Sequence, residues 1–473
     1  MFILHKRIAM SLLIRNGLVV TGAAQGIGDV LCVGEKIVAV GDRLDAPSGV
    51  EVVDATGKYI FPGFIDPHTH IHLPFMGTLA KDTYETGTRA ALVGGTTTIF
   101  DMCCPGRDTP HWDGYREWRN RAEGRACCDY SFHMGVTHFD RASSPGELRR
   151  IVEEGVSSFK VFLAYKGALG IDDEALAQTL SLARELGVVT AAHCENETLV
   201  SELQGALLRA GRTGPEAHHD SRPPRVEAEG VHHLMTFAEM MRAPVYIVHL
   251  SCREALEEAL RARARGVSVR IETLIQYLTL SKTHAEQPAF EGAKFVMSPP
   301  LRDAANHDAL WNALEQGLVD TVATDHAPFD FATQKRMGEG DFTKIPNGIP
   351  ALEDRINLLH TQGVLTGKIR LSTLVNVAST NPAKIFGLYP RKGTIQPGAD
   401  ADLVVYDPGA RGIISARTQQ MNVDYSAFEG WETCGRPELV TLRGRVVVRD
   451  GHHVGTPGDG QFLRRPAQPP RFS

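Results

Sequence analysis

Two histidines one residue apart follow an apolar run near the start of the chain. Residues 60–70 read Ile-Phe-Pro-Gly-Phe-Ile-Asp-Pro-His-Thr-His, so His68 and His70 come directly after the apolar segment. On an extended strand, residues i and i+2 project to the same side, and imidazole is the commonest metal ligand among side chains. His68 and His70 are therefore candidate metal ligands. His72 forms a second His-x-His pair with His70, so spacing alone leaves the register open.

Four further ionisable residues interrupt or close apolar runs later in the chain, namely Lys160, His193, His249 and Asp325. Each has an ordinary interpretation by itself: a hydrogen-bonded core histidine, a lysine whose amine reaches solvent, or an aspartate that caps a turn. A buried ionisable group costs several kcal/mol unless it is paired or binds a metal. Together with the two earlier histidines, this set predicts a site for divalent transition metals, zinc first.

The runs that carry these residues alternate with amphipathic stretches, a pattern typical of repeated strand–helix units. The candidate strands lie at residues 60–66, 96–103, 130–136, 157–163, 188–194, 244–250, 267–274 and 320–325. Eight such units over roughly 260 residues match a (β/α)8 TIM barrel, whose active site lies at the C-terminal ends of its strands. The candidate ligands all fall at or near such ends, so we expect them to converge.

Both ends of the chain carry short β-like runs, such as Lys36-Ile-Val-Ala-Val before the barrel and Arg445-Val-Val-Val after it. The simplest organisation is an α/β barrel inserted into a small β-sandwich domain that both chain ends form. We expect the β-sandwich at residues 1–59 and 392–455 and the metal-dependent barrel at residues 60–391. A tail at 456–473, rich in Pro, Gly and Arg, suits an irregular segment, and a subunit interface is one place for it.

The composition is that of an ordinary globular protein, with 473 residues, 42% of them hydrophobic, and a formal net charge of −6. The sequence contains neither the basic patch of a nucleic-acid-binding protein nor the run of about 20 apolar residues that spans a membrane. Eight cysteines without a Cys-x-x-Cys pair favour reduced thiols in a cytoplasmic protein. The N-terminus lacks the pattern of a signal peptide, and Met1 and Met10 are both candidate starts.

Seven blocks around the candidate residues form an ordered set along the chain. They lie at residues 63–77, 159–166, 193–196, 248–251, 297–302, 324–329 and 345–348. Any one block is a weak signal, but the ordered set resembles the dihydropyrimidinase and hydantoinase family of cyclic amidohydrolases, over nearly the whole chain. Two departures from the family pattern, Cys194 for the usual alanine and Ala351 for a glycine, adjoin the pocket without removing a ligand.

The resemblance implies a binuclear zinc centre. The ligands it assigns are His68, His70 and Asp325 for the first metal, His193 and His249 for the second, and Lys160 between them. Lys160 would bridge the metals as N6-carboxylysine, a carbamate formed with CO2. This modification turns a cation without acceptors into an anion with two oxygens. The family's Asp-x-His-x-His register leaves His72 outside the centre.

The resemblance also implies the reaction, which opens the ring amide of 5,6-dihydropyrimidines or hydantoins to give N-carbamoyl amino acids. The metals would lower the pKa of a shared water from about 16 toward about 7, and the resulting hydroxide would attack the amide carbon. Tyr165 would stabilise the oxyanion, and Asp325 would carry the proton to the leaving nitrogen. Backbone groups of Ser298 and Asn347 would bind the imide edge of the ring. The family further suggests a homotetramer.

Related functions are alternatives because their sites look alike. Allantoinase would show the same metal ligands. Dihydroorotase carries an arginine two residues after the second ligand histidine, where this chain has His72, and this counts against it. A non-enzymatic, dihydropyrimidinase-related scaffold would have lost metal ligands, whereas all six positions are intact here. Leu73 and Phe75 are candidates for the pocket that receives the ring substituent.

Overall fold

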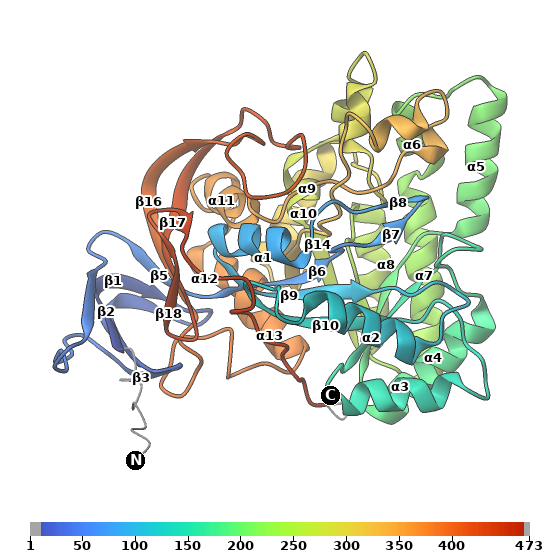
Figure 1. The fold of residues 1–473 in the computed structure, drawn as a ribbon. Helices are drawn as coiled ribbons and strands as arrows, with labels where there is room; N and C mark the ends of the chain where they lie inside the picture. Colours follow the sequence, from blue (N-terminus) through green and yellow to red (C-terminus); the bar gives the residue numbers. More distant parts are fainter. Residues whose placement is uncertain (1–10, 468–473) are drawn as a thin grey trace.

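The computed structural model describes residues 11–467 and contains a parallel β-barrel with a second sheet at its side (Figure 1). Barrel neighbours pair in parallel in the order in which they occur along the chain. The strands are β6 (Phe64–Thr69), β9 (Thr96–Cys103), β10 (Asp129–Gly135), β11 (Ser158–Phe162), β12 (Val189–His193), β13 (Val245–Ile247), β14 (Val269–Leu274) and β15 (Thr321–Ala323). A backbone bridge joins Thr69 to His326, just after the last strand. The predicted eight-stranded barrel is confirmed.

Helices cover the outside of the barrel and follow its strands along the chain (Figure 1). They are α1 (Tyr84–Val93), α2 (His111–Ala122), α3 (Ser144–Glu153), α4 (Asp173–Leu186), α5 (Glu197–Arg209), α6 (Glu216–Ser221), α7 (Pro224–Met241), α8 (Arg253–Ala264), α9 (Ile275–Thr279), α10 (Ala305–Glu315), α11 (Arg355–Leu358), α12 (Leu371–Val375) and α13 (Asn381–Ile385). Within residues 11–467, none of the helices combines the length and the apolar character needed to cross a bilayer.

Helix α4 shows how the local sequence forms these elements. The Asp172 side chain accepts a backbone N–H of the first turn, which satisfies one of the donors that a helix N-terminus leaves free. Leu176, Leu180 and Ala183 recur at helical spacing and are buried, so one face packs on the barrel. Gly187 ends the helix with φ at 65°, a conformation that glycine adopts without strain. The helix therefore begins directly beside the loop that follows β11.

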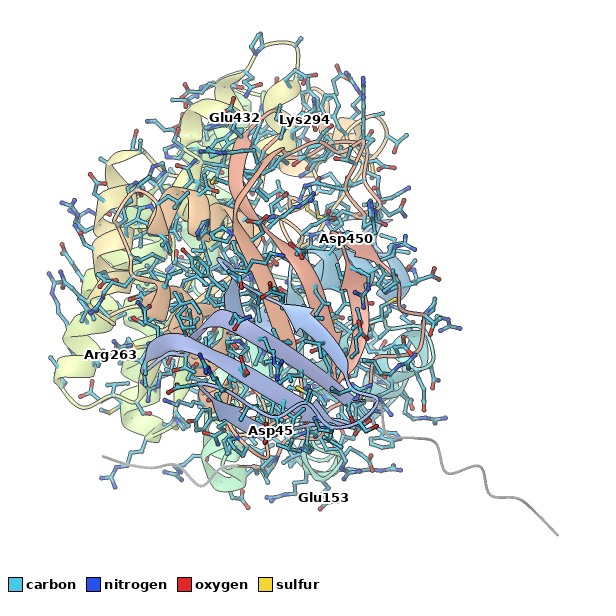
Figure 2. The ribbon with its side chains drawn as sticks, turned by 90° about the vertical axis from the view of Figure 1, so that its left-hand side faces the viewer. Asp45, Glu153, Arg263, Lys294, Glu432 and Asp450 are labelled. Atoms are coloured by element: carbon cyan, nitrogen blue, oxygen red, sulfur yellow. The ribbon has the colours of Figure 1, made fainter. Side chains whose placement is uncertain are left out.

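A second sheet contains strands from both ends of the chain. They are β1 (Ser11–Val20), β2 (Gln25–Val33), β3 (Lys36–Gly41), β4 (Glu51–Asp54) and β5 (Tyr59–Pro62), then β16 (Leu403–Ile413), β17 (Glu432–Leu442), β18 (Arg445–Arg449) and β19 (His452–His453). Figure 2 shows the early strands in blue and the late strands in red on one face. Ile14, Val30 and Val405 belong to a core separate from that of the barrel. A separate β-structure made by both chain ends is thus confirmed.

The strand expected at residues 60–66 is wrong as a single element. Strand β5 ends at Pro62 in the second sheet, and β6 begins at Phe64 in the barrel. The chain changes sheets at Gly63, where an added Cβ would lie 2.1 Å from Thr97 Oγ1, so only glycine fits this close approach. One uninterrupted apolar run concealed the change. The division into domains at residues 59 and 391 stays a prediction.

The final described segment, residues 456–467, packs against the barrel of its own chain. Leu463 N donates to Tyr130 O at 2.7 Å, and Arg465 N donates to Gly155 O at 2.9 Å. The side chains of Leu463 and Arg465 are buried. A role of the tail at a subunit interface stays a prediction. Residues 468–473 and the alternative start at Met10 lie outside the described residues.

Candidate metal centre

All six predicted ligands converge at the C-terminal ends of the barrel strands. They are His68 in β6, His70 directly after it, Lys160 in β11, His193 at the end of β12, His249 after β13 and Asp325 after β15. Five of the six are buried, and the side chain of Asp325 is 13% exposed. The strand ends that sequence analysis selected therefore lie around one point inside the barrel.

Three of these residues form a compact group. The Nε2 atoms of His68 and His70 each lie 3.1 Å from Asp325 Oδ1, and 3.3 Å from one another. Within the described part of the chain, these are the three histidine, cysteine or acidic residues whose ligand atoms all lie within 4.8 Å of one another. Two imidazoles and a carboxylate are a donor set that zinc accepts.

A second group faces the first across the end of the barrel. His193 Nδ1 lies 3.0 Å from His249 Nε2, and the rings of His68 and His249 stack with centroids 5.5 Å apart. Lys160 Nζ is buried and has no hydrogen-bond partner among the described residues. Buried polar atoms without partners are uncommon in folded proteins. The buried amine of Lys160 and the nitrogens of His193 and His249 are thus further groups that could bind a divalent metal ion at this end of the barrel.

Two carboxylates orient the histidines, and sequence analysis did not identify either of them. Glu272 Oε1 in β14 lies 2.7 Å from His68 Nδ1, and Glu195 Oε2 lies 2.8 Å from His193 Nε2. A carboxylate on one ring nitrogen fixes the tautomer and leaves the other nitrogen free to bind a metal. Burial alone would raise the pKa of Glu195, but the charge of Arg222 helps to lower it to about 2. The signal for Glu272 was a carboxylate within an apolar strand, the same kind of signal that marked the candidate ligands.

Burial keeps several of these groups uncharged. Burial lowers the pKa of His70 to about 4, and burial together with His193 and Lys160 lowers the pKa of His249 well below its ordinary value. Burial likewise lowers the pKa of Lys160. At His68, burial also lowers the pKa, but the carboxylates of Asp325 and Glu272 outweigh burial and raise it to about 9. The neutral imidazole, with a lone pair free for a metal, is therefore favoured at His70 and His249.

The backbone is strained at three positions of the site. Tyr165, His249 and Asp325 have φ angles of 66°, 42° and 50°, in the left-handed region that residues other than glycine rarely adopt. Such outliers cluster at functional sites, where the surrounding structure holds them. His72 also has a positive φ, but it is only half-buried, and the charged residues that contribute most to its pKa shift after burial, Arg121 and Glu117, are on α2 rather than among the candidate ligands.

A narrow cavity of about 40 Å³ opens above the candidate ligands. Tyr165, Ser298 and Asn347 line it, and Asn347 Nδ2 lies 3.0 Å from Ser298 Oγ and 3.5 Å from Tyr165 Oη. Leu73 and Phe75 also line it, the latter from the hairpin of β7 (Pro74–Phe75) and β8 (Thr78–Leu79). The predicted substrate-binding and substituent residues thus surround one space.

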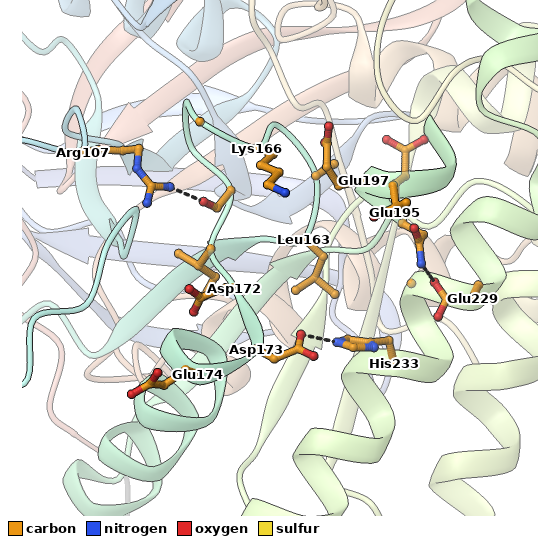
Figure 3. Close-up of a pocket in the computed structure, with 17 residues that line it drawn as sticks. Arg107, Leu163, Lys166, Asp172, Asp173, Glu174, Glu195, Glu197, Glu229 and His233 are labelled. Atoms are coloured by element: carbon orange, nitrogen blue, oxygen red, sulfur yellow. Dashed lines mark hydrogen bonds and ion pairs between the residues drawn. The ribbon is translucent and has the colours of Figure 1, made fainter. Parts of the chain in front are cut away.

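A larger cavity of about 810 Å³ adjoins the same segment, and Leu163, Lys166 and Asp172 are among its lining residues (Figure 3). Phe162, Tyr165 and Leu169 line the narrow cavity, whereas other residues of the same segment, among them Leu163 and Lys166, line the large one. None of the six candidate ligands lines the large cavity. Its wall includes Glu197, whose Oε2 accepts the backbone N–H of Tyr165 at 2.5 Å. The large cavity therefore adjoins the candidate centre and contributes a support for Tyr165.

Comparison with known proteins places the chain in a family. The model of the amidohydrolase family matches residues 59–447. The D-hydantoinase of Geobacillus stearothermophilus is 46% identical over 456 residues, which cover 96% of this chain and 97% of that protein. The solved structure of a D-hydantoinase (dihydropyrimidinase) from a Thermus species has a TM-score of 0.95 and 55% identity, covering 97% of this chain and all of that one. A dihydropyrimidinase from Brevibacillus agri has a TM-score of 0.95 and 45% identity, covering 97% and 99%. The chain belongs to the amidohydrolase family, among its hydantoinases and dihydropyrimidinases.

Proposed function

We propose that the protein is a binuclear-metal hydrolase of cyclic diamides, which opens 5,6-dihydropyrimidines, hydantoins or both to N-carbamoyl amino acids. The observation that carries this proposal is the convergence of four histidines and Asp325 around Lys160 Nζ, which has no hydrogen-bond partner among the described residues. The names of the relatives, D-hydantoinase and dihydropyrimidinase, support the substrate class. Allantoin hydrolysis is the alternative that shares the ligand set.

Two divalent ions, zinc first, are the proposed cofactors. His68, His70 and Asp325 would hold one ion, His193 and His249 would hold the other, and a carboxylated Lys160 would serve as a ligand of both. A neutral, buried amine is the form that reacts with CO2, and burial favours that form at Lys160. When bound, the ions lower the pKa of a water molecule toward neutrality and polarise the amide carbonyl. The carbamate adds the negative charge that a centre with only one carboxylate otherwise lacks.

The remaining roles belong to residues of the cavity. Burial raises the pKa of Tyr165, so its hydroxyl stays protonated and donates to the oxygen that becomes negative, a contribution of about 3 kcal/mol in other hydrolases. Asp325 takes the proton of the attacking water and delivers it to the ring nitrogen that leaves. Ser298 and Asn347 bind the imide edge of the ring through their backbones. Together these contacts orient the amide carbon toward the water.

The ring substituent is proposed to lie against Leu73 and Phe75. The rings of Phe75 and Tyr165 meet edge to face with centroids 5.4 Å apart, so a group at this position contacts both the apolar wall and the catalytic tyrosine. An apolar pocket discriminates by only about 1–3 kcal/mol for one methylene. The proposal therefore allows several 5-substituents and ranks them by size.

The first test is ring opening by zinc-loaded protein in the presence of bicarbonate. The substrates are dihydrouracil, hydantoin, a 5-substituted hydantoin, allantoin and dihydroorotate. Turnover of one of the first three supports the proposal and ranks its substrates. Turnover of allantoin or dihydroorotate alone assigns the protein to another activity of the family. Protein that holds two metals per chain and opens none of the rings contradicts the proposed substrate class.

A pair of histidine variants provides the matched control. His70→Asn removes a proposed ligand, whereas His72→Asn changes the adjacent histidine of the same motif, and asparagine tolerates the positive φ found there. We expect His70→Asn to lose bound metal and activity, and His72→Asn to retain both. Equal metal content in the two variants contradicts the assignment of His70.

A further inference from the structure

A buried lysine outside the metal centre joins two segments that line the narrow cavity. Lys335 begins the short 3-10 helix η3 (Lys335–Gly338) and is fully buried. Its Nζ donates to Val296 O at 2.9 Å, to Pro346 O at 2.6 Å and to Gly348 O at 2.7 Å. An ammonium group has three N–H donors and no acceptor. All three donors are therefore used on backbone carbonyls of two separate loops.

These carbonyls lie next to the residues proposed to bind the ring. Val296 precedes Ser298 by two positions, and Pro346 and Gly348 flank Asn347. Gly348 N donates to Val296 O at 3.0 Å, so this carbonyl accepts from both the second loop and the lysine. The ammonium of Lys335 lies where the two loops meet and sets the distance between them.

The charge of Lys335 contributes little to stability by itself. Among the described residues no charged neighbour shifts its pKa, and burial lowers that pKa well below the ordinary value. Burying a charge without a counter-ion is costly, and an apolar side chain of similar length would fill the space without that cost. What the amine alone provides is a fixed geometry, because its three tetrahedral donors determine where the three carbonyls lie.

The preceding residue extends the same connection to a third wall of the cavity. Gln334 Nε2 donates to Thr78 Oγ1 at 2.6 Å and to Leu79 O at 2.7 Å. Both acceptors lie in β8, which pairs with the strand that carries Phe75. Residues 334 and 335 therefore connect the hairpin on the substituent side with the two loops on the imide side.

We propose that Lys335 is a positioning residue for ring binding, whose ammonium holds Ser298 and Asn347 at the separation that the imide edge of the substrate requires. This inference rests on the proposed function, since it assumes that those two loops bind the ring. Contacts to the imide edge exist before and during the reaction, so their loss weakens binding more than the chemical step. The metal ligands lie on other elements and keep their places.

The test compares Lys335→Met with Lys392→Met, which removes a different buried lysine that is paired with Asp129 and Asp402. For Lys335→Met we expect KM for the best ring substrate to rise about tenfold, with kcat within about threefold of wild type and zinc content unchanged. Lys392→Met is expected to lower the unfolding midpoint without changing KM. An unchanged KM in Lys335→Met, or a fall in kcat together with loss of zinc, overturns the proposal.

Hydrogen exchange gives a readout that does not depend on catalysis. In Lys335→Met, amides of residues 295–301 and 345–350 should exchange faster than in wild type, whereas those of β11 and β12 should not. Lys335→Gln, which keeps a shorter amide donor, should show a smaller change in both KM and exchange, and it replaces the methionine variant if that one fails to fold. Wild-type exchange in both loops overturns the proposed link. Inactive wild-type protein contradicts the proposed function instead, while exchange still decides whether Lys335 joins the loops.

Discussion

Each end of the barrel contains a buried lysine, and the two lysines differ in whether a carboxylate pairs with them. At the C-terminal end, Lys160 Nζ has no hydrogen-bond partner, and burial lowers its pKa. At the N-terminal end, Lys392 Nζ lies 2.8 Å from Asp129 Oδ2 and also contacts Asp402. Burial there opposes the charge, but the aspartates outweigh it and raise the pKa of Lys392. The amine at the C-terminal end is therefore left without an ion pair, whereas the charge of the lysine at the N-terminal end is neutralised by aspartates of the protein itself.

This difference separates function from stability along one barrel. Groups at the N-terminal end form a closed network, since Asp129 also contacts Arg443 from the second sheet. Such a network holds the barrel to the second sheet and pairs the charge of Lys392 within the protein. At the C-terminal end, none of the described residues forms a hydrogen bond with Lys160 Nζ, and burial outweighs the charges of Asp325 and Glu272 and lowers the pKa of Lys160. TIM barrels generally carry their chemistry at this end, and the unpaired atoms give the physical reason in this chain.

The sharpest test of the comparison is Lys160→Met. The variant lacks the proposed bridge, so we expect kcat to fall by at least about 1,000-fold, because metal-assisted hydrolysis needs the assembled centre. The metal-free variant should unfold at the same temperature as the metal-free wild type or higher, since an unpartnered buried amine has been removed. Activity assays, metal analysis and thermal unfolding measure these effects. A stable variant with activity near that of wild type would contradict the functional role proposed for Lys160.

The opposite result is expected from Lys392→Met. Removing one partner of a buried ion pair leaves uncompensated charge, so the free energy of unfolding should fall by about 3–5 kcal/mol. Turnover per folded molecule should stay near that of wild type because Lys392 lies at the other end of the barrel. Urea unfolding and active-site titration distinguish the two quantities. An unchanged stability would show that this network is not what holds the N-terminal end.

A buried carboxylate can also be neutralised by binding a proton, which makes the free energy of unfolding depend on pH. Burial, with Asp354 next to it, raises the pKa of Glu353 to about 8, and burial raises that of Asp354 to about 7. At a pH between the unfolded and the folded pKa of such a group, the folded state holds a proton that the unfolded state has lost. The free energy of unfolding therefore falls as pH rises from about 5 to 8, by at most about 1.4 kcal/mol per pH unit for each group. In Glu353→Gln, urea unfolding at several pH values should show a smaller decline. An identical pH dependence in both proteins would contradict these protonation states.

The smallest expected effect concerns the wall between the two cavities. Glu197→Gln weakens the acceptor that holds the backbone N–H of Tyr165, and a neutral hydrogen bond is worth roughly half a charged one. We expect kcat/KM to fall by about three- to tenfold, with metal content and stability unchanged. Ser201→Ala, which removes a hydroxyl that donates to the other carboxylate oxygen, is the control and should change less. Equal losses in both variants would indicate a general disturbance of α5.

The candidate ligands could be found from the sequence because each places an ionisable side chain within or directly after an apolar run. His68 and His70 share one side of a strand through its two-residue period, and His193 and His249 place a polar group in an apolar run. Gly63 was missed because the apolar run continues through it, and nothing local marks a change of sheet. Lys335 was missed for a different reason: its three acceptors are backbone carbonyls, and these have no signature in the sequence.

The sequence by itself determined the order of elements, the barrel and the residue types at its C-terminal end, because hydrophobic period and polar interruptions are local properties. Only the tertiary structure decided which buried side chains pair with one another through hydrogen bonds and ion pairs. It brought Glu272 to His68 across 204 positions. It also gave Lys392 three aspartates, whereas none of the described residues forms a hydrogen bond with Lys160 Nζ. Whether a buried charge is neutralised depends on which groups the fold brings within a few ångströms, and separation along the chain carries no such information.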